Sequence, residues 1–273
     1  MNGLSATTTH AAVKFQDGSW TSADDEIAVE YPLTIFVNDE EFATVVCTPS
    51  DLDELVIGFL ASEGVIGSHR DLKQLLIDTG KGFAYADLQY ELKLEQRLFS
   101  QRRITSCCGK SRQSFYFFSD ARTAKPVTCT VTVTIEDCQR LMRDLQQGSL
   151  IHQQTGGVHN AALYGQQGIV VRYSDIGRHN ALDKIFGYCL RNELDMSDKI
   201  LVFSGRISSE VLLKAAKIGA GILISKSAPT DLALNLAEEL GITAVGFVRN
   251  GRANVYTGAH RVVMHADRRE APQ

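Results

Sequence analysis

The pattern of hydrophobic and polar positions changes near Leu33. Residues 1–25 are mostly small or polar and show no periodicity, so we expect a mobile arm there. After it, LTIFV and FATVVC are two short apolar runs on either side of Asn38-Asp39. Asn and Asp tolerate the backbone conformations of tight turns. This stretch therefore predicts a β-hairpin.

A helix is predicted to follow the hairpin. Pro49 and Ser50 precede apolar residues spaced three to four positions apart, which is the spacing of one helix face, and Gly64 is placed to end the helix. The alternation in FAYADLQYEL and the aromatic run 115–118 predict two further strands. A loop containing two cysteines lies between them.

The second half of the chain alternates regularly between helices and strands. The predicted elements are a helix over 135–147, strand 169–173, helix 181–190, strand 200–203, helix 210–218, strand 222–225, helix 230–240 and strand 244–248. This order predicts a layered α/β sheet. The segment 119–128 contains Pro126 and few large apolar residues, and it is the candidate boundary. We expect a mobile arm over 1–25, a smaller N-terminal α+β region over 26–125, and an α/β domain over 126–273.

Composition and charge narrow the class of protein. With 273 residues and 44% hydrophobic residues, the chain can bury a substantial core. No run approaches the roughly 18 apolar residues of a membrane helix, and the N-terminus lacks the features of a signal peptide, so we expect a cytoplasmic protein without a membrane partner. The net charge of -4, with acids and bases interspersed, argues against nucleic acid as a partner.

Three predicted turns from a strand to a helix combine small or polar residues with a basic one. They are Ser174–Asn180, Ser204–Arg206 and Ser225–Pro229. In an open α/β sheet such turns gather at the carboxyl ends of the strands, where helix N-termini favour anions. The loop after the last predicted strand, Phe247–Arg252, adds two guanidiniums that can clamp phosphate oxygens. The alternative is that these residues serve only helix capping and solubility, because none of the loops is a P-loop or a complete G-x-G-x-x-G motif.

His159 in GGVHNAAL is a second candidate. Zinc deaminases use H-x-E followed by P-C-x-x-C. Here Ala161 stands at the Glu position and no P-C-x-x-C occurs, so zinc deamination is excluded on chemical grounds and no metal site is expected. His159 is either a structural or a ligand-contacting residue.

The third candidate is the basic segment RRITSCCGKSR, which contains Cys107 and Cys108. Nearby Lys and Arg lower the pKa of a thiol, and the small neighbours together with Gly109 leave the sulfur accessible for nucleophilic transfer. The alternative is that both cysteines are small apolar fillers, an interpretation that suits Cys47, Cys129, Cys138 and Cys189 better. A disulfide between the adjacent pair is disfavoured, because a trans peptide holds their Cα atoms about 3.8 Å apart. No C-x-x-C pair occurs, so neither a disulfide scaffold nor a zinc ribbon is expected.

Several long blocks of the sequence resemble the FdhD family of formate dehydrogenase accessory proteins. They include EYPLTIFVNDEEFAT, DELVIGFLASEGVI, GGVHNAAL, DIGRHNALDKIFGYCLR, VFSGRISSEVLLKAAKIG, SAPTDLALNLAEELGIT and GFVRNGRANVYT, and they extend from about Glu30 to Thr257. The resemblance implies a cytidine-deaminase-like layered α/β/α domain and a homodimer. It also implies a sulfurtransferase that takes sulfur from a cysteine desulfurase as a persulfide. The sulfur is delivered to the molybdenum bis(pyranopterin guanine dinucleotide) cofactor that the catalytic subunit of formate dehydrogenase needs.

The same resemblance assigns roles to residues. The family's S-C-G-x-C loop falls on residues 107–111, where Cys108 matches the persulfide-bearing cysteine. The family's cofactor-contact loop matches Phe247, Val248, Arg249, Asn250, Gly251 and Arg252. This chain departs from the pattern, because Ser111 replaces the second family cysteine and Cys107 precedes the first. Either Cys108 suffices, or Cys107 takes part.

Two further hypotheses remain beside sulfur transfer. A non-catalytic chaperone would bind the molybdenum cofactor and formate dehydrogenase without moving sulfur, and the loss of the second family cysteine favours it. A nucleotide-phosphate hydrolase has little support, because no carboxylate cluster for Mg²⁺ lies near the loops in the sequence.

Overall fold

The computed structural model describes residues 4–91, 102–104 and 124–263. The chain divides into two compact units, each assembled from several stretches of sequence. Unit 1 comprises residues 1–115, 147–161 and 172–194, and unit 2 comprises 116–146, 162–171 and 195–273. This division differs from the predicted boundary near residue 126, because two later stretches belong to the first unit.

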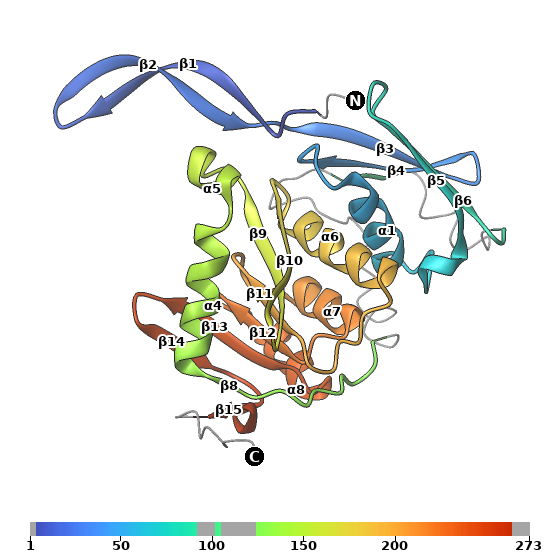
Figure 1. The fold of residues 1–273 in the computed structure, drawn as a ribbon, viewed down its shortest axis with the longest axis vertical. Coiled ribbons are helices and arrows are strands. Elements are labelled where there is room, and N and C mark those ends of the chain that lie inside the picture. Colours follow the sequence, from blue (N-terminus) through green and yellow to red (C-terminus); the bar gives the residue numbers. More distant parts are fainter. Residues whose placement is uncertain (1–3, 92–101, 105–123, 264–273) are drawn as a thin grey trace. The chain divides into compact units, whose positions relative to one another are not determined.

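Unit 1 is built on a five-stranded sheet with the strand order β5-β6-β3-β4-β7. The elements of this unit are β1 Thr7–Gln16, β2 Ser19–Ala28, β3 Tyr31–Val37, β4 Glu40–Cys47, α1 Leu52–Ser62, β5 Leu72–Asp78, β6 Phe83–Leu88, β7 Arg102–Ile104, α5 Leu150–Thr155 and α6 Arg178–Arg191, with a 3-10 turn at His69–Asp71. Helices α1 and α6 pack against each other (Figure 1).

The predicted hairpin and helix of this unit are confirmed. Asn38 and Asp39 have φ values of 48° and 66°, the left-handed conformation that a tight turn between β3 and β4 requires. Helix α1 ends as expected, with Gly64 at a φ of 73° just beyond it. Nine of its eleven residues are buried, which explains the apolar stretch in the sequence.

The N-terminal segment differs from the expected arm without regular structure. Residues 7–28 form an antiparallel hairpin, with Phe15 paired to Trp20 next to the turn. All of its residues are exposed or half-buried. Because neither face is buried, the sequence has no alternation of apolar and polar residues from which the strands can be predicted. Whether the hairpin moves in solution stays a prediction.

Unit 2 contains most of a six-stranded sheet with the order β10-β9-β11-β12-β13-β14. The elements are β8 Val133–Thr134, α4 Ile135–Gln147, β11 Ile200–Phe203, α7 Ser209–Ile218, β12 Ile222–Ser225, α8 Asp231–Glu239, β13 Thr243–Arg249, β14 Arg252–Val255 and β15 Val262–Val263, with a 3-10 turn at Ala259–Arg261. Strands β9 His159–Gly165 and β10 Gly168–Asp175 run from one unit into the other.

Helices cover both faces of this sheet. Val202, Ile224 and Val245 share a buried cluster with Leu141 and Leu145 of α4. Alternate strand residues such as Leu201 and Leu223 are also fully buried and point to the opposite face, where α7 and α8 pack (Figure 1). The layered α/β fold expected from the alternating pattern is therefore confirmed.

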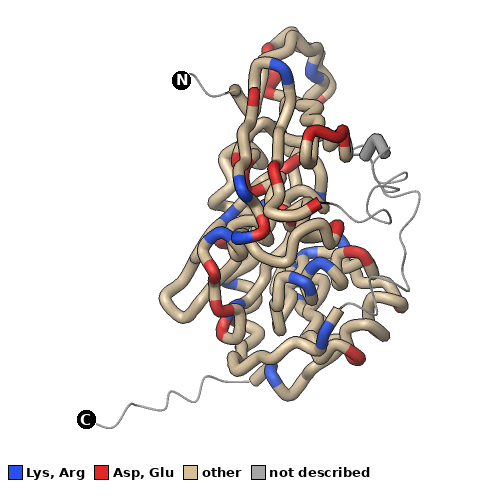
Figure 2. The backbone as a smooth tube through the Cα atoms, turned by 90° about the vertical axis from the view of Figure 1, so that its right-hand side faces the viewer, with Lys and Arg blue, Asp and Glu red and all other residues tan. Residues whose placement is uncertain are grey.

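Acidic and basic residues are interspersed along the described chain, as its net charge of -4 suggests (Figure 2). Within the described residues, no helix combines the length and the apolar character needed to cross a membrane.

Candidate functional site

Three loops meet at one edge of the sheet in unit 2. Strands β11, β12 and β13 are parallel neighbours, so their carboxyl ends share that edge. Ser225 Oγ donates a hydrogen bond to the carbonyl of Gly205 at 2.6 Å, and the amide of Phe247 donates to the carbonyl of Ser227 at 3.1 Å. The turns 204–206 and 225–229 and the loop 247–252 are thus joined, as the sequence predicted.

Two helices begin at these loops. Ser208 caps α7, and its hydroxyl accepts from the amide of Val211 at 3.4 Å. Thr230 precedes α8, and its side chain makes no capping hydrogen bond. Helix N-termini carry unpaired N–H groups and a partial positive charge, so this edge favours an anionic group.

The predicted binding loop is the tip of a β-hairpin. Asn250 and Gly251 have φ values of 51° and 75°, which fits a two-residue turn with both central residues left-handed. Arg249 and Arg252 face each other across the turn. The expectation that β13 is the last strand is wrong, because Arg252 opens the further strand β14. The Asn250-Gly251 pair is typical of a hairpin turn, and this hairpin could have been predicted from it.

Phe247 sits at an irregularity in the pairing of β13 with β14. Its φ of 53° is unusual and strained for an aromatic residue. The guanidinium of Arg249 lies 5.6 Å from the centre of its ring, within range of a cation–π interaction. Gly246 permits the neighbouring loop to come close, since a Cβ there would lie 3.1 Å from the carbonyl oxygen of Ser227.

Four cationic side chains belong to these loops. Arg206, Arg249 and Arg252 are exposed, and Lys226 is half-buried. In the part of the chain that the structure describes, none of the four forms an ion pair with a carboxylate. Their charges are therefore available to phosphate oxygens, which guanidiniums bind through paired hydrogen bonds.

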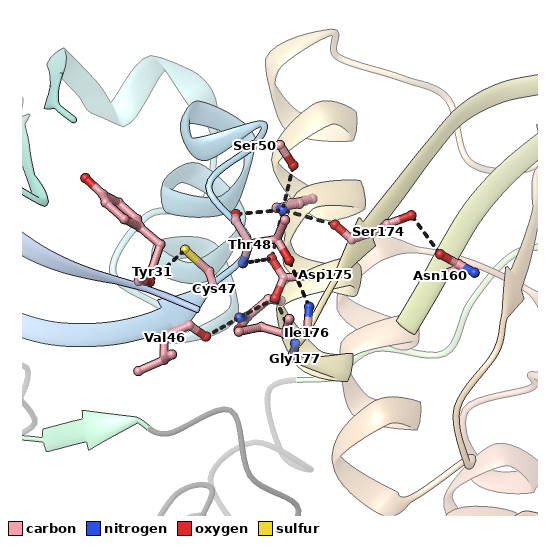
Figure 3. Close-up of polar contacts among 12 residues, drawn as sticks. Tyr31, Val46, Cys47, Thr48, Ser50, Asn160, Ser174, Asp175, Ile176 and Gly177 are labelled. Atoms are coloured by element: carbon pink, nitrogen blue, oxygen red, sulfur yellow. Dashed lines mark hydrogen bonds and ion pairs between the residues drawn. The ribbon is translucent and has the colours of Figure 1, made fainter. Parts of the chain in front are cut away.

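The turn Ser174–Asn180 was expected to lie beside the other two turns at the sheet edge. It lies in unit 1, where Asp175 forms a buried ion pair (Figure 3). Lys184 Nζ lies 2.8 Å from Asp175 Oδ2, and both side chains are fully buried. Asp175 also accepts hydrogen bonds from the amides of Thr48 at 3.1 Å and Gly177 at 2.8 Å. Burial raises the pKa of Asp175, while Lys184 and the hydrogen bonds from Gly177 and Asn180 oppose the rise.

Lys184 holds the same turn from its other side. Its ammonium donates to the carbonyls of Ser174 at 3.2 Å and Thr48 at 3.4 Å. Asn180 donates from Nδ2 to Asp175 Oδ1 at 2.8 Å. Asp175, Lys184 and Asn180 thus satisfy one another's polar groups, and together they fix the end of β4 against the start of α6. Sequence reasoning missed Lys184, because a lysine in a helix is ordinarily solvent-exposed.

Known proteins resemble this chain over most of its length. The sequence profile of the FdhD/NarQ family matches residues 28–263. The chain belongs to the FdhD/NarQ family. It is 57% identical over 256 residues to a protein named sulfur carrier protein FdhD from Halalkalibacterium halodurans, covering 93% of this chain and 95% of that protein. It is 53% identical to a protein of the same name from Bacillus subtilis, covering 91% of this chain and 95% of the relative.

A solved structure has the same fold as this FdhD/NarQ chain. It is described as a putative formate dehydrogenase accessory protein from Desulfotalea psychrophila, and it superposes with a TM-score of 0.79 at 24% sequence identity. The match covers 95% of this chain and all of the other. At this identity the likeness establishes the fold alone.

The cysteine loop of this FdhD/NarQ chain lies outside the described residues. Strand β7 ends at Ile104, four residues before Cys108 in the sequence. The four described cysteines are free thiols, of which Cys47, Cys138 and Cys189 are buried and Cys129 packs half-buried against the core of unit 2. Their expected packing role is confirmed.

Two of these thiols have a strongly raised pKa. Burial is the main cause of a rise in pKa to about 12 for both Cys47 and Cys138. Both therefore stay protonated at neutral pH and are poor nucleophiles.

His159 is half-buried at the start of β9. No group of three or more His, Cys, Asp or Glu side chains suited to a metal ion occurs among the residues with described positions.

Proposed function

We propose that this protein accepts sulfur from a cysteine desulfurase as a persulfide on Cys108 and delivers it to the molybdenum bis(pyranopterin guanine dinucleotide) cofactor of formate dehydrogenase. The observation that carries the proposal is the 57% identity, over 93% of the chain, to a protein named sulfur carrier protein FdhD. The sequence resemblance assigns the carrier role to Cys108, which four basic side chains flank in the segment 102–112.

The first transfer needs only a thiolate at Cys108. The thiolate attacks the outer sulfur of the donor's persulfide, so the donor S–S bond breaks as a new S–S bond forms on Cys108. The donor cysteine leaves as a thiolate, and the step requires no external oxidant or reductant. Basic neighbours favour this step because they stabilise the attacking thiolate.

The loops in unit 2 form the binding site that we propose for the molybdenum cofactor. Its guanine dinucleotides carry pyrophosphates, and Arg206, Lys226, Arg249 and Arg252 have no carboxylate partner in the described part of the chain. We assign the cofactor contacts to the hairpin 247–252, with α7 and α8 directing their N-termini to the same edge. The strained backbone at Phe247 supports a functional rather than a purely structural role for this hairpin.

Mass spectrometry tests the assignment of Cys108. The full chain is incubated with a cysteine desulfurase and cysteine, and the peptide that contains Cys108 is expected to gain one sulfur atom. Cys108→Ala should lose the label, whereas Cys107→Ser, a matched change at the neighbouring residue, should retain it. Persistence of the label in Cys108→Ala would refute the assignment.

A second candidate function is a cofactor-binding chaperone that moves no sulfur through its own thiols. The observation that favours it is Ser111, which stands where the family pattern has its second cysteine. Cells that lack their own accessory protein distinguish the two functions. If the double variant Cys107→Ser, Cys108→Ser restores formate dehydrogenase activity there, the protein acts as a chaperone; if it does not, the carrier function stands.

A further inference from the structure

A buried serine lies where the loops of the proposed cofactor site meet. Ser225 is the last residue of β12, and it is fully buried like the three apolar residues before it. A strand that is buried on both faces is normally apolar throughout. A hydroxyl at such a position needs hydrogen-bond partners inside the protein, because an unsatisfied buried hydroxyl is costly. The partners of Ser225 therefore indicate its role.

The first partner of this serine fixes the turn that contains Lys226. The amide of Ser227 donates to Ser225 Oγ at 3.0 Å. A bond between a serine hydroxyl and the amide two residues later closes a tight turn. The amide of Lys226, which this turn encloses, donates to the carbonyl of Phe203 at 3.2 Å. Both contacts hold the backbone that carries the Lys226 side chain.

The second partner lies in the turn that contains Arg206. Ser225 Oγ donates to the carbonyl of Gly205 at 2.6 Å, and Gly205 directly precedes Arg206 in the sequence. The hydroxyl thus gives its proton to one turn and accepts a hydrogen bond within the other. A methyl group could make neither contact. The serine therefore joins the turns 204–206 and 225–229.

The hairpin 247–252 is attached to the same turn. Ser227, whose amide binds Ser225, accepts through its carbonyl from the amide of Phe247 at 3.1 Å. Phe247 has a φ of 53°, a conformation that persists in an aromatic residue only where surrounding contacts hold it. Two successive hydrogen bonds therefore link Ser225 to the strained residue at which the hairpin begins.

We propose that Ser225 is a positioning residue for the anion-binding loops of unit 2, because its hydroxyl fixes the turns 204–206 and 225–229 and the hairpin 247–252 relative to one another. The inference rests on the proposed function, which assigns the phosphate groups of the molybdenum cofactor to these loops. Ser225 has no exposed surface, so it acts through the loops and not by contact with the ligand.

Calorimetric titration of the full chain with guanosine diphosphate tests this role. Loops that are held in place before binding lose less entropy when the ligand arrives. Ser225→Ala is expected to weaken binding about fivefold or more, because a carbonyl and an amide lose their partner and the loops loosen. Ser225→Cys fills the same space, but a thiol is only a weak donor and acceptor, so this variant should also bind weakly. Wild-type affinity in Ser225→Cys would overturn the proposal, even if Ser225→Ala folded poorly.

Thr257→Val is the matched control. Thr257 is buried in the same unit, and its hydroxyl also donates to a carbonyl, that of Ile242 at 2.7 Å, and accepts from an amide, that of Ala244 at 3.0 Å. These contacts lie around the start of β13, at the end opposite to the hairpin. Thr257→Val should lower the denaturant unfolding midpoint about as much as Ser225→Ala, yet leave the affinity for guanosine diphosphate unchanged. Equal losses of affinity in the two variants would reduce the effect to one of stability and overturn the proposal.

Two further variants and a ligand-free measurement separate this inference from the proposed function. If Arg249→Gln and Arg252→Gln weaken binding and Ser225→Ala does not, the cofactor assignment stands and the role of Ser225 is wrong. If the wild-type chain does not bind guanosine diphosphate, the cofactor assignment is wrong, and amide hydrogen exchange decides on Ser225 without a ligand. Ser225→Ala should speed exchange in all three loops, including the amide of Phe247. An increase confined to the amide of Ser227 would overturn the proposal.

Discussion

At the scale of single residues, the buried pair of Asp175 and Lys184 shows how this protein tolerates charge in its interior. Removing two charges from water is costly, and the cost is offset only where geometry is good and the remaining donors and acceptors are satisfied. Both conditions hold here, with a 2.8 Å contact and further hydrogen bonds to each partner. The pair therefore ties β4 to α6.

Lys184→Met should destabilise the protein by about 3–5 kcal/mol, because Asp175 is left buried and unpaired. Denaturant unfolding measures this change. Asp175→Asn combined with Lys184→Met should cost less than Lys184→Met alone, since no charge then remains. As a control, Arg191→Gln breaks a more exposed pair with Glu54 and should cost less than about 1 kcal/mol. Equal losses for the single and double variants would contradict a role for charge pairing.

At the scale of elements, two glycines set the packing of α1 on α6. A Cβ at Gly58 would overlap the carbonyl of Asp183, and one at Gly187 would overlap the carbonyl of Glu54. Backbone atoms cannot rotate away as side chains do, so these positions admit only glycine at this helix separation. Both glycines occur within helical patterns in the sequence. Only the packing of the partner helix explains why glycine is needed at these two positions.

Gly58→Ala and Gly187→Ala should each force the two helices apart. Overpacking costs typically about 1–3 kcal/mol and occasionally more, and the upper end is expected here because backbone atoms are involved. Gly67→Ala is the matched control, since its Cβ would meet only Asp71 Oδ2 at an ordinary 3.7 Å. Urea unfolding midpoints compare the three variants. A loss in Gly67→Ala as large as in the helical variants would count against the packing argument.

At the scale of the whole molecule, the chain has two units and an N-terminal hairpin with little burial. Val13, Phe15 and Trp20 of that hairpin are 65%, 58% and 70% exposed, and the rings of Phe15 and Trp20 lie 4.8 Å apart. Isolated two-stranded hairpins are only marginally stable in water. This cross-strand aromatic contact supports it, together with the antiparallel pairing of the two strands and the ion pair of Lys14 with Asp25 at 2.7 Å.

Trp20 is the only tryptophan of the chain, so all tryptophan fluorescence reports on this hairpin. Because the side chain is largely exposed, acrylamide should quench its emission nearly as well in the folded protein as in the protein unfolded by denaturant. Stern–Volmer titrations in both states measure the ratio, and Trp20→Phe supplies the background. Strong protection in the folded state would contradict the exposed hairpin.

The sequence by itself determined the elements whose cause is local. Helix α4 and strands β11 and β12 have the predicted bounds. The one buried face of α4 imposes a helical period on its residues, and the complete burial of β11 and β12 makes each a short, continuous apolar run. The turns at Asn38-Asp39 and Asn250-Gly251 follow from residues that accept a left-handed backbone. Membership of the FdhD/NarQ family likewise rests on long blocks of residues in the sequence alone, and it is confirmed.

Only the tertiary structure decided which of these parts meet. The hairpin 7–28 depends on pairing between strands that bury neither face, so no period marks it. The division into units follows long-range contacts, and it assigns residues 147–161 and 172–194 to the first unit. Of the three similar turns in the sequence, two lie at the carboxyl ends of β11 and β12, while Ser174–Asn180 closes around Lys184. Such roles depend on groups more than a hundred residues apart, such as the amide of Thr48 and the carboxylate of Asp175, so the local sequence cannot predict them.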